Sequence, residues 1–176
     1  MVQVEEEVGC EAVRMLLDEE VFAVVLAVSV VASAVGIALV LGPGGSEAFT
    51  AIGLLNSECR IGEYPVKAYN GSTLHLCLFI YNHMGEAIYY RVAYKIAASQ
   101  GDMPTNTTPS PRPVIAEWKG VLGDGWNETT RVEVPVAAPS GSSRVALVFE
   151  LWVYRQGEGW VYTGRWVHLY VNVTSW

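Results

Sequence analysis

An uninterrupted apolar run at residues 21–41 limits what this chain can fold into more than any other feature. The run contains no charged residue and no proline. A helix rises about 1.5 Å per residue, so the run would span roughly 30 Å, the thickness of the hydrocarbon core of a bilayer. A buried helix of a soluble protein would normally keep a polar face over such a length. The sequence therefore predicts a single transmembrane helix at residues 21–41.

The sequences on either side predict how this helix is used. Residues 1–20 contain seven acidic residues and one arginine, whereas a cleaved signal peptide would need a basic leader and a shorter apolar core. We therefore expect an uncleaved signal-anchor that follows an acidic cytoplasmic tail at residues 1–20, and we expect this tail to be helical. Residues 42–47, which are rich in glycine, are predicted to be a linker to a domain at residues 48–176.

Glycosylation sequons predict which side of the membrane that domain occupies. The pattern Asn-X-Ser/Thr occurs after the apolar run and never before it, at Asn70, Asn106, Asn127 and Asn172. The alternative explanation is that Asn, Ser and Thr are common in the loops of β-rich domains. We expect the domain to be extracellular with N-linked glycans at these positions, and the N-terminus to be cytoplasmic.

The formal net charge of −7 is unevenly distributed along the chain. Residues 1–20 hold seven acids and one base, a net charge of −6, and residues 43–176 hold eleven acids and ten bases, a net charge of −1. The predicted outer domain is therefore almost neutral and has no basic cluster in its sequence. Proteins that bind nucleic acid normally carry a basic surface, so we expect no nucleic acid partner.

From residue 48 onward, short runs alternate between apolar and polar residues and are separated by Gly, Pro and Asn. This pattern is typical of β-strands joined by turns. Two of the runs, residues 74–80 and 88–96, are predicted to pair as a hairpin around a turn at residues 82–85. About seven short strands predict an all-β, immunoglobulin-like antiparallel β-sandwich, with a small closed barrel as the alternative.

The last two runs predict a second hairpin with a defined register. A four-residue turn at residues 156–159 would join strands at residues 144–155 and 160–173. Counting outward from this turn places Phe149 opposite Trp166, Val153 opposite Tyr162, and Glu150 opposite Arg165. The last of these pairs brings opposite charges together, which supports the register.

Three cysteines bear on the predicted topology. Cys10 lies in the predicted cytoplasmic tail and is expected to be free, whereas Cys59 and Cys77 lie in the predicted outer domain, where disulfides persist. A bridge between Cys59 and Cys77 would contribute about 3 kcal/mol by restricting the unfolded chain. The alternative is that Cys77 is a free and buried side chain in a strand.

The sequence contains no arrangement that is typical of a catalytic or metal site. Its three histidines, His75, His83 and His168, have no acidic residue at metal-ligand spacing. No nucleophile elbow, zinc-protease motif, phosphate-binding loop or dinucleotide-binding motif occurs. We therefore expect no enzymatic activity, no metal and no cofactor.

Aromatic residues are numerous for one small sandwich. Large aromatic side chains anchor protein interfaces and stack on sugars, but they also fill the cores of β-proteins. Four tryptophans are candidates for a contact surface, with core packing as the alternative: Trp118, Trp126, Trp152 and Trp160.

Small residues form a stripe on the predicted transmembrane helix. Ser29, Ala32, Ser33 and Gly36 recur at spacings of three and four, so they share one face of a helix. In lipid, such a stripe lets two helices approach closely and associate by packing. Small residues are also tolerated in any membrane span, which is the alternative. The stripe favours a helix of another integral membrane subunit as the partner.

Three segments after the apolar run resemble one known protein family. They are FTAIGLLNSECRIGEYP, YNGSTLHLCLFIYNHMGEAIYYRVAYKI and LYVNV, and their most specific motifs are Glu63-Tyr64-Pro65 and Asn82-His83 followed by Tyr89-Tyr90. These segments, over roughly residues 48–173, resemble an archaeal membrane-protein family of unknown function, the DUF1616 type. The resemblance implies an archaeal envelope protein with an outer sandwich domain, and it implies no activity.

Together these features predict a membrane-anchored protein of the cell surface without catalytic chemistry. The leading hypothesis is a non-catalytic accessory subunit of a larger membrane protein complex. It depends on the acidic tail, the helix rich in small residues and the absence of a reaction centre in the sandwich. The alternative is a stand-alone surface protein that binds glycans or neighbouring cells through its aromatic side chains.

Overall fold

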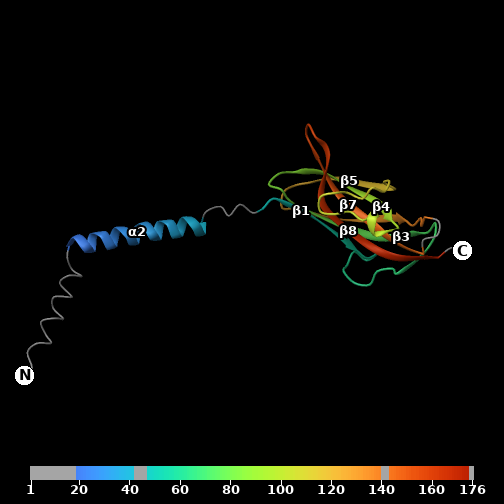
Figure 1. Cartoon of the computed structure of the whole chain (residues 1–176), viewed down its shortest axis with the longest axis horizontal. Coiled ribbons are helices and arrows are strands. Elements are labelled where there is room, and N and C mark those ends of the chain that lie inside the picture. The colour runs from blue at the N-terminus through green and yellow to red at the C-terminus, as the bar shows by residue number, and fades with distance from the viewer. Residues whose placement is uncertain (1–18, 42–46, 140–142, 175–176) are drawn as a thin grey trace, which may run out of the picture. The chain divides into compact units, whose positions relative to one another are not determined.

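The computed structural model describes residues 19–41, 47–139 and 143–174, and in its first segment it describes the side chains of residues 21–37. The chain divides into two compact units, Met1–Ser46 and Glu47–Trp176. Figure 1 shows the helix of the first unit and the strands of the second. The helix expected in the acidic tail, the position of Cys10 and most of the expected linker lie outside the described residues.

The described part of the first unit is a single helix, α2 (Glu19–Leu41), of 23 residues. Its described side chains are all exposed and almost all apolar, so the helix has no polar face over residues 21–37. Its two serines bond within the helix, because the Oγ atoms of Ser29 and Ser33 each donate to the carbonyl four residues earlier at 2.7 Å. Over the residues whose side chains are described, no helix is long and apolar enough to cross a membrane.

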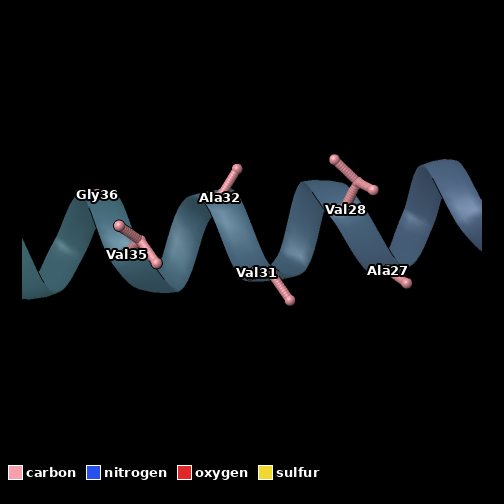
Figure 2. Close-up of a pocket in the computed structure, with 6 residues that line it drawn as sticks. All are labelled: Ala27, Val28, Val31, Ala32, Val35 and Gly36. Carbon is pink, nitrogen blue, oxygen red and sulfur yellow. The ribbon is translucent and has the colours of Figure 1, made fainter.

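The predicted small-residue stripe lies along α2. Ser29 and Ser33 are one turn apart, and so are Ala32 and Gly36. Figure 2 shows Ala32 and Gly36 along one edge of the helix, with Val31 pointing to the opposite side. A Cβ added to Gly36 would meet nothing within 4 Å, so its backbone is open to close approach.

Eight strands form two sheets in the described part of the second unit. The strands are β1 (Phe49–Leu55), β2 (Lys67–Tyr69), β3 (Thr73–His83), β4 (Ile88–Ala97), β5 (Ala116–Leu122), β6 (Asn127–Pro135), β7 (Arg144–Arg155) and β8 (Gly159–Thr174). One sheet has the order β1-β3-β6 and the other β2-β8-β7-β4-β5. All pairs are antiparallel except β2 with β8. The unit is therefore mostly β-sheet and consistent with a β-sandwich, as the sequence predicts.

The core lies between the two sheets and follows from the alternation along the strands. Leu76 of β3 and Tyr94 of β4 are 1% and 0% exposed, and they belong to one apolar cluster with residues of both sheets. Two tyrosines of β4 also bond to the opposite sheet. The Tyr94 hydroxyl donates to the Pro135 carbonyl at 2.8 Å, and the Tyr90 hydroxyl donates to Glu128 at 2.9 Å. Strand β4 is therefore held against the opposite sheet both by its buried side chains and by these two hydrogen bonds.

The hairpin predicted for residues 74–80 and 88–96 is not formed. β3 pairs with β1 and β6, whereas β4 pairs with β5 and β7 in the other sheet. The two strands pack face to face across the core instead of sharing an edge. The reason is that alternation identifies the buried face of each strand, but it does not distinguish an edge partner from a partner in the opposite sheet.

Asn82 holds the chain where it crosses from β3 to β4. Its side chain is fully buried and donates to the Glu86 carbonyl at 2.8 Å and to the Leu122 carbonyl at 3.0 Å. Its Oδ1 accepts from the Met84 amide at 3.1 Å. Its backbone amide donates to the Trp126 carbonyl at 3.0 Å. One asparagine therefore joins the β3–β4 crossing to the β5–β6 turn.

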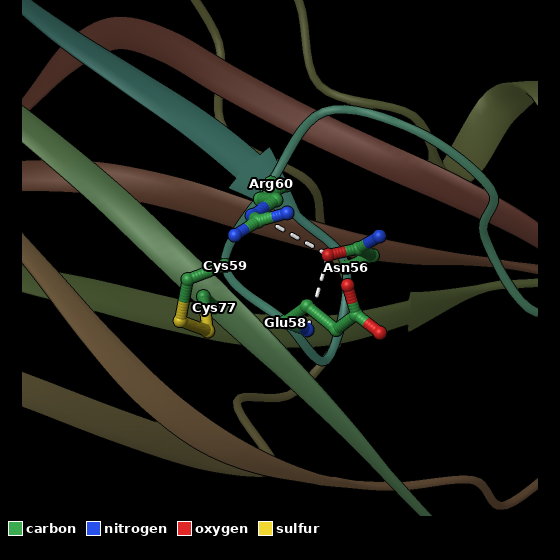
Figure 3. The surroundings of a disulfide bond; sticks show 5 residues. All are labelled: Asn56, Glu58, Cys59, Arg60 and Cys77. Atoms are coloured by element: carbon green, nitrogen blue, oxygen red, sulfur yellow. Dashed lines mark hydrogen bonds between the residues drawn. A yellow bond between two sulfur atoms is a disulfide. The ribbon is translucent and has the colours of Figure 1, made fainter.

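A disulfide joins Cys59 to Cys77, with Cα atoms 5.2 Å apart. Cys77 lies in β3 and is fully buried, and Cys59 lies in the loop that follows β1. Figure 3 shows the Asn56 side chain beside this bond, where its Oδ1 accepts from the Glu58 and Arg60 amides at 3.1 and 3.0 Å. The asparagine shapes the loop that brings Cys59 over the sheet.

The register predicted for the final hairpin is wrong at its tip. Arg155 pairs with Gly159, not with Trp160, so the turn has three residues instead of four. Gly157 and Gly159 have φ angles of 88° and 80°, which only glycine adopts readily, and these allow the tighter turn.

A bulge then shifts the register in the opposite direction. Residues 163–165 of β8 lie opposite Leu151, so Glu150 faces Trp166 and the predicted pair with Arg165 is absent. Gly164 at the centre of the bulge has a φ of 73°, and a Cβ there would collide with the backbone of the 98–115 segment. The corrected pairs are Phe149 with Val167, Glu150 with Trp166, Trp152 with Tyr162, and Val153 with Val161.

Replacing Asn82 by alanine should lower the free energy of unfolding by about 2–4 kcal/mol, because buried carbonyls and an amide lose their partners. Urea unfolding of the unglycosylated full chain in mild detergent, followed by tryptophan fluorescence, measures the change. The control is Asn127→Ala at an exposed position, which should cost less than about 0.5 kcal/mol. Equal losses in the two variants would contradict the role of Asn82.

Candidate functional site

The outer face of the five-stranded sheet gathers aromatic and charged side chains. Alternation along β4 turns Tyr90 and Val92 into the core and therefore turns Tyr89, Arg91 and Lys95 outward. The segment that joins β4 to β5, residues 98–115, packs over part of this face and includes the short helix η1 (Gln100–Asp102). The outer face thus has a covered half and an open half.

A buried ion pair holds the covered half together. Lys95 Nζ lies 2.9 Å from Glu150 Oε2, and these side chains are 6% and 0% exposed. Lys95 also donates to the Ser110 carbonyl at 2.7 Å, while the Ser110 amide donates to Glu150. Glu150 further accepts from the Trp152 indole nitrogen at 3.3 Å. These hydrogen bonds of the ion pair therefore fix the covering segment at Ser110 and the Trp152 ring at its border.

The open half is called the aromatic–cation face here. Its residues come from β4, β5, β7 and β8: Tyr89, Arg91, Glu117, Lys119, Trp152, Tyr154 and Trp160. The guanidinium carbon of Arg91 lies 5.0 Å from the centroid of the Trp152 ring and 4.8 Å from that of the Trp160 ring. A cation over an aromatic face is attracted by the quadrupole of the ring. The two indoles therefore hold Arg91 in place.

Glu117 balances the positive charge of this face. Its two carboxylate oxygens lie 3.1 Å from the Arg91 Nη1 and 2.9 Å from the Lys119 Nζ. The hydrogen bond from Lys119, followed by the charge of Arg91, lowers the pKa of the Glu117 carboxyl in spite of partial burial. Two cations against one anion leave the aromatic–cation face with a net positive charge.

Tyr89 and Tyr154 are the partly exposed members of the aromatic cluster. Tyr89 is 42% exposed and Tyr154 is 50% exposed. The Tyr89 ring lies 5.1 Å from the Trp160 ring and 6.3 Å from the Tyr154 ring, centroid to centroid. Tyrosine, tryptophan and arginine are the residues that most often dominate binding energy at protein interfaces. The cluster therefore has the composition of an interface centre.

The four tryptophans predicted as a contact surface separate into three environments. Trp118 packs against the core beside Phe149, with ring centroids 6.2 Å apart. Trp126 lies just before β6 and is 70% exposed. Trp152 and Trp160 share the aromatic–cation face through Arg91. Sequence reasoning missed Arg91, Glu117 and Lys119, although the alternation within each strand already placed them opposite the core positions.

All four sequon asparagines are exposed in the structure. Asn70 lies in the turn between β2 and β3, and its Oδ1 accepts from the Ala138 amide at 3.0 Å. Asn106 belongs to the 98–115 segment, Asn127 begins β6, and Asn172 lies near the end of β8. None of these side chains is covered by the rest of the described chain.

The histidines lie apart from the aromatic–cation face. His83 stacks on Tyr81, with ring centroids 6.2 Å apart, and His168 contacts the Tyr170 ring at 4.8 Å. Burial lowers the pKa of His168 below its ordinary value. Within the described ranges, no group of three or more His, Cys, Asp or Glu side chains could hold a metal ion.

Replacing Lys95 by methionine should lower the free energy of unfolding by about 3–5 kcal/mol, because the Glu150 carboxylate stays buried without its partner. The double variant Lys95→Met/Glu150→Gln removes both charges and should recover more than half of that loss. Urea unfolding monitored by tryptophan fluorescence measures both variants. A double variant as unstable as the single one would show that pairing of charge is not what holds this half of the face.

Acid should weaken the aromatic–cation face. Since the folded-state pKa of Glu117 is lowered, its contribution to stability is present above the unfolded pKa of roughly 4.3 and is lost as the pH falls through the folded value. Lys119→Met should raise the pKa of Glu117, as measured by carboxyl ¹³C NMR titration. Lys67→Met on β2, at the opposite edge of the sheet, is the control and should leave that pKa unchanged. Equal shifts would refute the assigned cause.

Comparisons with known proteins give weak likenesses only. No protein-family model and no curated protein matches the chain. Among solved structures, it is similar to a β-glucosidase from Listeria innocua with a TM-score of 0.40 and 16% identity, over 77% of this chain and 17% of that chain. It is also similar to the sporulation control protein Spo0M from Bacillus subtilis with a TM-score of 0.42 and 8% identity, over 71% of this chain and 49% of that chain. The chain thus spans a small part of the glucosidase and about half of Spo0M.

Proposed function

We propose that this chain is a single-pass, membrane-anchored accessory subunit of a larger membrane protein complex, and that it has no catalytic role. The observation that carries the proposal is the aromatic–cation face. Arg91 is held there by two indole rings, and the partly exposed Tyr89 and Tyr154 lie beside it. Rigid aromatic side chains around an arginine resemble the centre of a protein interface.

The anchor in this proposal is α2. Its apolar side chains are exposed all around the helix, and its serine hydroxyls bond to the backbone of the same helix. In water such a helix would expose apolar surface at a cost of roughly 25 cal/mol per Å². In lipid that surface needs no cover, and the backbone polar groups are already bonded. These properties support a bilayer as the environment of the helix.

The proposed orientation has the N-terminus in the cytoplasm and the sandwich outside the cell. Two observations support it. The four sequon asparagines are exposed, so each could receive a glycan without unfolding the domain. The Cys59–Cys77 bridge also suits an oxidising compartment, because cytosolic thiols are normally kept reduced.

The contact within the membrane is assigned to the small-residue stripe on α2. Ser29, Ala32, Ser33 and Gly36 would dock on a helix of another subunit, since small side chains permit close packing. The acidic tail at residues 1–20 would meet a basic surface of the complex on the cytoplasmic side. The aromatic–cation face would form the third contact, above the bilayer.

Two finer assignments belong to the same proposal. The strand order, with a three-stranded sheet facing a five-stranded one that has β7 at its centre, supports an immunoglobulin-like topology. The sequence resemblance to the DUF1616 type supports an archaeal source. Neither assignment implies a reaction.

Binding of a glycan is the second candidate, and the exposed rings of Tyr89 and Tyr154 favour it, because sugars stack on such rings. The two indoles of the same face argue for a protein instead. Trp152 and Trp160 already hold the Arg91 guanidinium at 5.0 and 4.8 Å, which occupies ring surface that a sugar would need. A protein partner is therefore the better fit.

Purification from native membranes in mild detergent tests the function. Wild-type chain should bring down a fixed set of integral membrane proteins in constant ratio. Arg91→Ala/Trp160→Ala should lose at least one of them while the sandwich remains folded by circular dichroism. The control is Arg131→Ala, an exposed position on β6 of the other sheet, which should keep them all.

Three outcomes would count against the proposal. Release of the chain from membranes by alkaline carbonate without detergent would exclude the anchor. Migration of the extracted chain alone, or only with copies of itself, would favour the stand-alone surface protein. Binding to a glycan array that Arg91→Ala/Trp160→Ala abolishes would favour the glycan-binding candidate.

A further inference from the structure

We infer that one end of the sandwich rests on the bilayer surface, with the Trp126 indole in the headgroup region. This end, called the tether end, comprises the start of β1, the β3–β4 crossing and the β5–β6 turn. The inference rests on the proposed membrane anchor, because the surface in question is that of the same bilayer. The ligand is the lipid–water interface and not a pocket-bound molecule.

Strand pairing places Trp126 close to the point where the chain enters the sandwich. Phe49, the first residue of β1, pairs with His83, and Thr50 pairs with Asn82. The Asn82 amide in turn bonds to the Trp126 carbonyl. Trp126 is therefore two strand spacings from the start of β1, about 10 Å.

The covalent chain limits how far this end can lie from α2, whatever the orientation of the two units. From Leu41, the last residue of α2, to Phe49 there are eight residues. A fully extended chain of that length covers at most roughly 28 Å. If α2 spans a bilayer, the first residue of β1 therefore lies within that reach of the end of the span.

The exposed side chains at the tether end suit an interface between lipid and water. Trp126 is 70% exposed, and Phe49 is 39% exposed. The Phe49 ring lies 5.7 Å from the Tyr81 ring and 5.3 Å from the His83 ring, centroid to centroid. Tryptophan and tyrosine are enriched at membrane interfaces because their apolar rings carry a polar group that remains hydrated.

The turn that carries Trp126 is rigid, so the exposure of the indole is fixed by the fold. The Gly125 amide donates to the Asn82 carbonyl at 2.8 Å, and the Trp126 amide donates to the Gly123 carbonyl at 3.2 Å. Asp124 Oδ1 accepts from the Gly85 amide at 2.8 Å. Little backbone entropy of the turn therefore remains to be lost when the ring enters an interface.

Charge at the tether end favours a surface without net negative charge. Exposed acids outnumber bases there, since the described residues of the tether end include Glu47, Glu86 and Asp124 but no lysine or arginine. Anionic headgroups would repel this end, so zwitterionic headgroups are the expected contact. The aromatic–cation face belongs to the five-stranded sheet, whereas Phe49 and Asn82 lie in the three-stranded sheet and Trp126 lies just before its strand β6.

Fluorescence quenching in vesicles tests the inference. The full chain is reconstituted in phosphatidylcholine vesicles whose acyl chains carry bromine near the headgroups. Wild-type tryptophan emission should be quenched relative to vesicles without bromine, and Trp126→Phe should lose most of that quenching. The control is Trp118→Phe, which removes a core-packed indole and should retain it.

The outcomes separate this inference from the proposed function. If the chain stays in the vesicles after alkaline carbonate but Trp126→Phe is quenched as strongly as wild type, the tether-end contact is wrong and the anchor stands. If carbonate removes the chain from the vesicles, the anchor fails, and the contact fails with it. Stronger association with vesicles rich in phosphatidylglycerol than with phosphatidylcholine would overturn the assigned headgroup preference.

Discussion

The hydrogen bonds of Asn82 are the constraint on which the rest of the sandwich depends. The side chain sits without solvent exposure where the chain leaves one sheet for the other. It binds the Glu86 and Leu122 carbonyls, and through its backbone it fixes the turn before β6. A buried polar group of this kind is stable only when every partner is present. The geometry of two separate turns is therefore set at one residue.

A second buried polar group divides the outer face of the five-stranded sheet. Lys95 and Glu150 hold the 98–115 segment down over one half and leave the other half open. The open half begins at Trp152, whose indole nitrogen bonds to the same glutamate. The position of the aromatic–cation face thus follows from where the covering segment stops.

The sequence predicts well which face of each strand is buried, but it predicts poorly which strands pair with each other. Alternation identified the inward residues of β3 and β4, because a period of two depends only on local geometry. It paired these strands wrongly, since the same pattern arises whether the neighbour is beside a strand or across the core. The hairpin register failed for a related reason, because Gly159 and the bulge at Gly164 change the count between pairs.

The candidate site was predictable only to a limited extent. Aromatic excess pointed to tryptophans, but it could not separate Trp118 in the core from Trp152 and Trp160 on the outer face. That distinction needs the strand order, which brings Arg91 and Glu117 together from neighbouring strands. The open choice between a free and a bridged Cys77 likewise needed the loop that carries Cys59 over the sheet.

The place of the disulfide decides how the sandwich would respond to mechanical force. Tension applied at residue 47 acts first on β1, whose hydrogen bonds to β3 can break in succession. Beyond β1 the load reaches Cys59, and there it passes through a covalent bond to Cys77 in the central strand of that sheet. The extension is then limited to the chain before Cys59, roughly 40 Å when fully stretched. Under tension, β1 would detach before the other strands. Its detachment would absorb mechanical work while the remaining seven described strands stay folded.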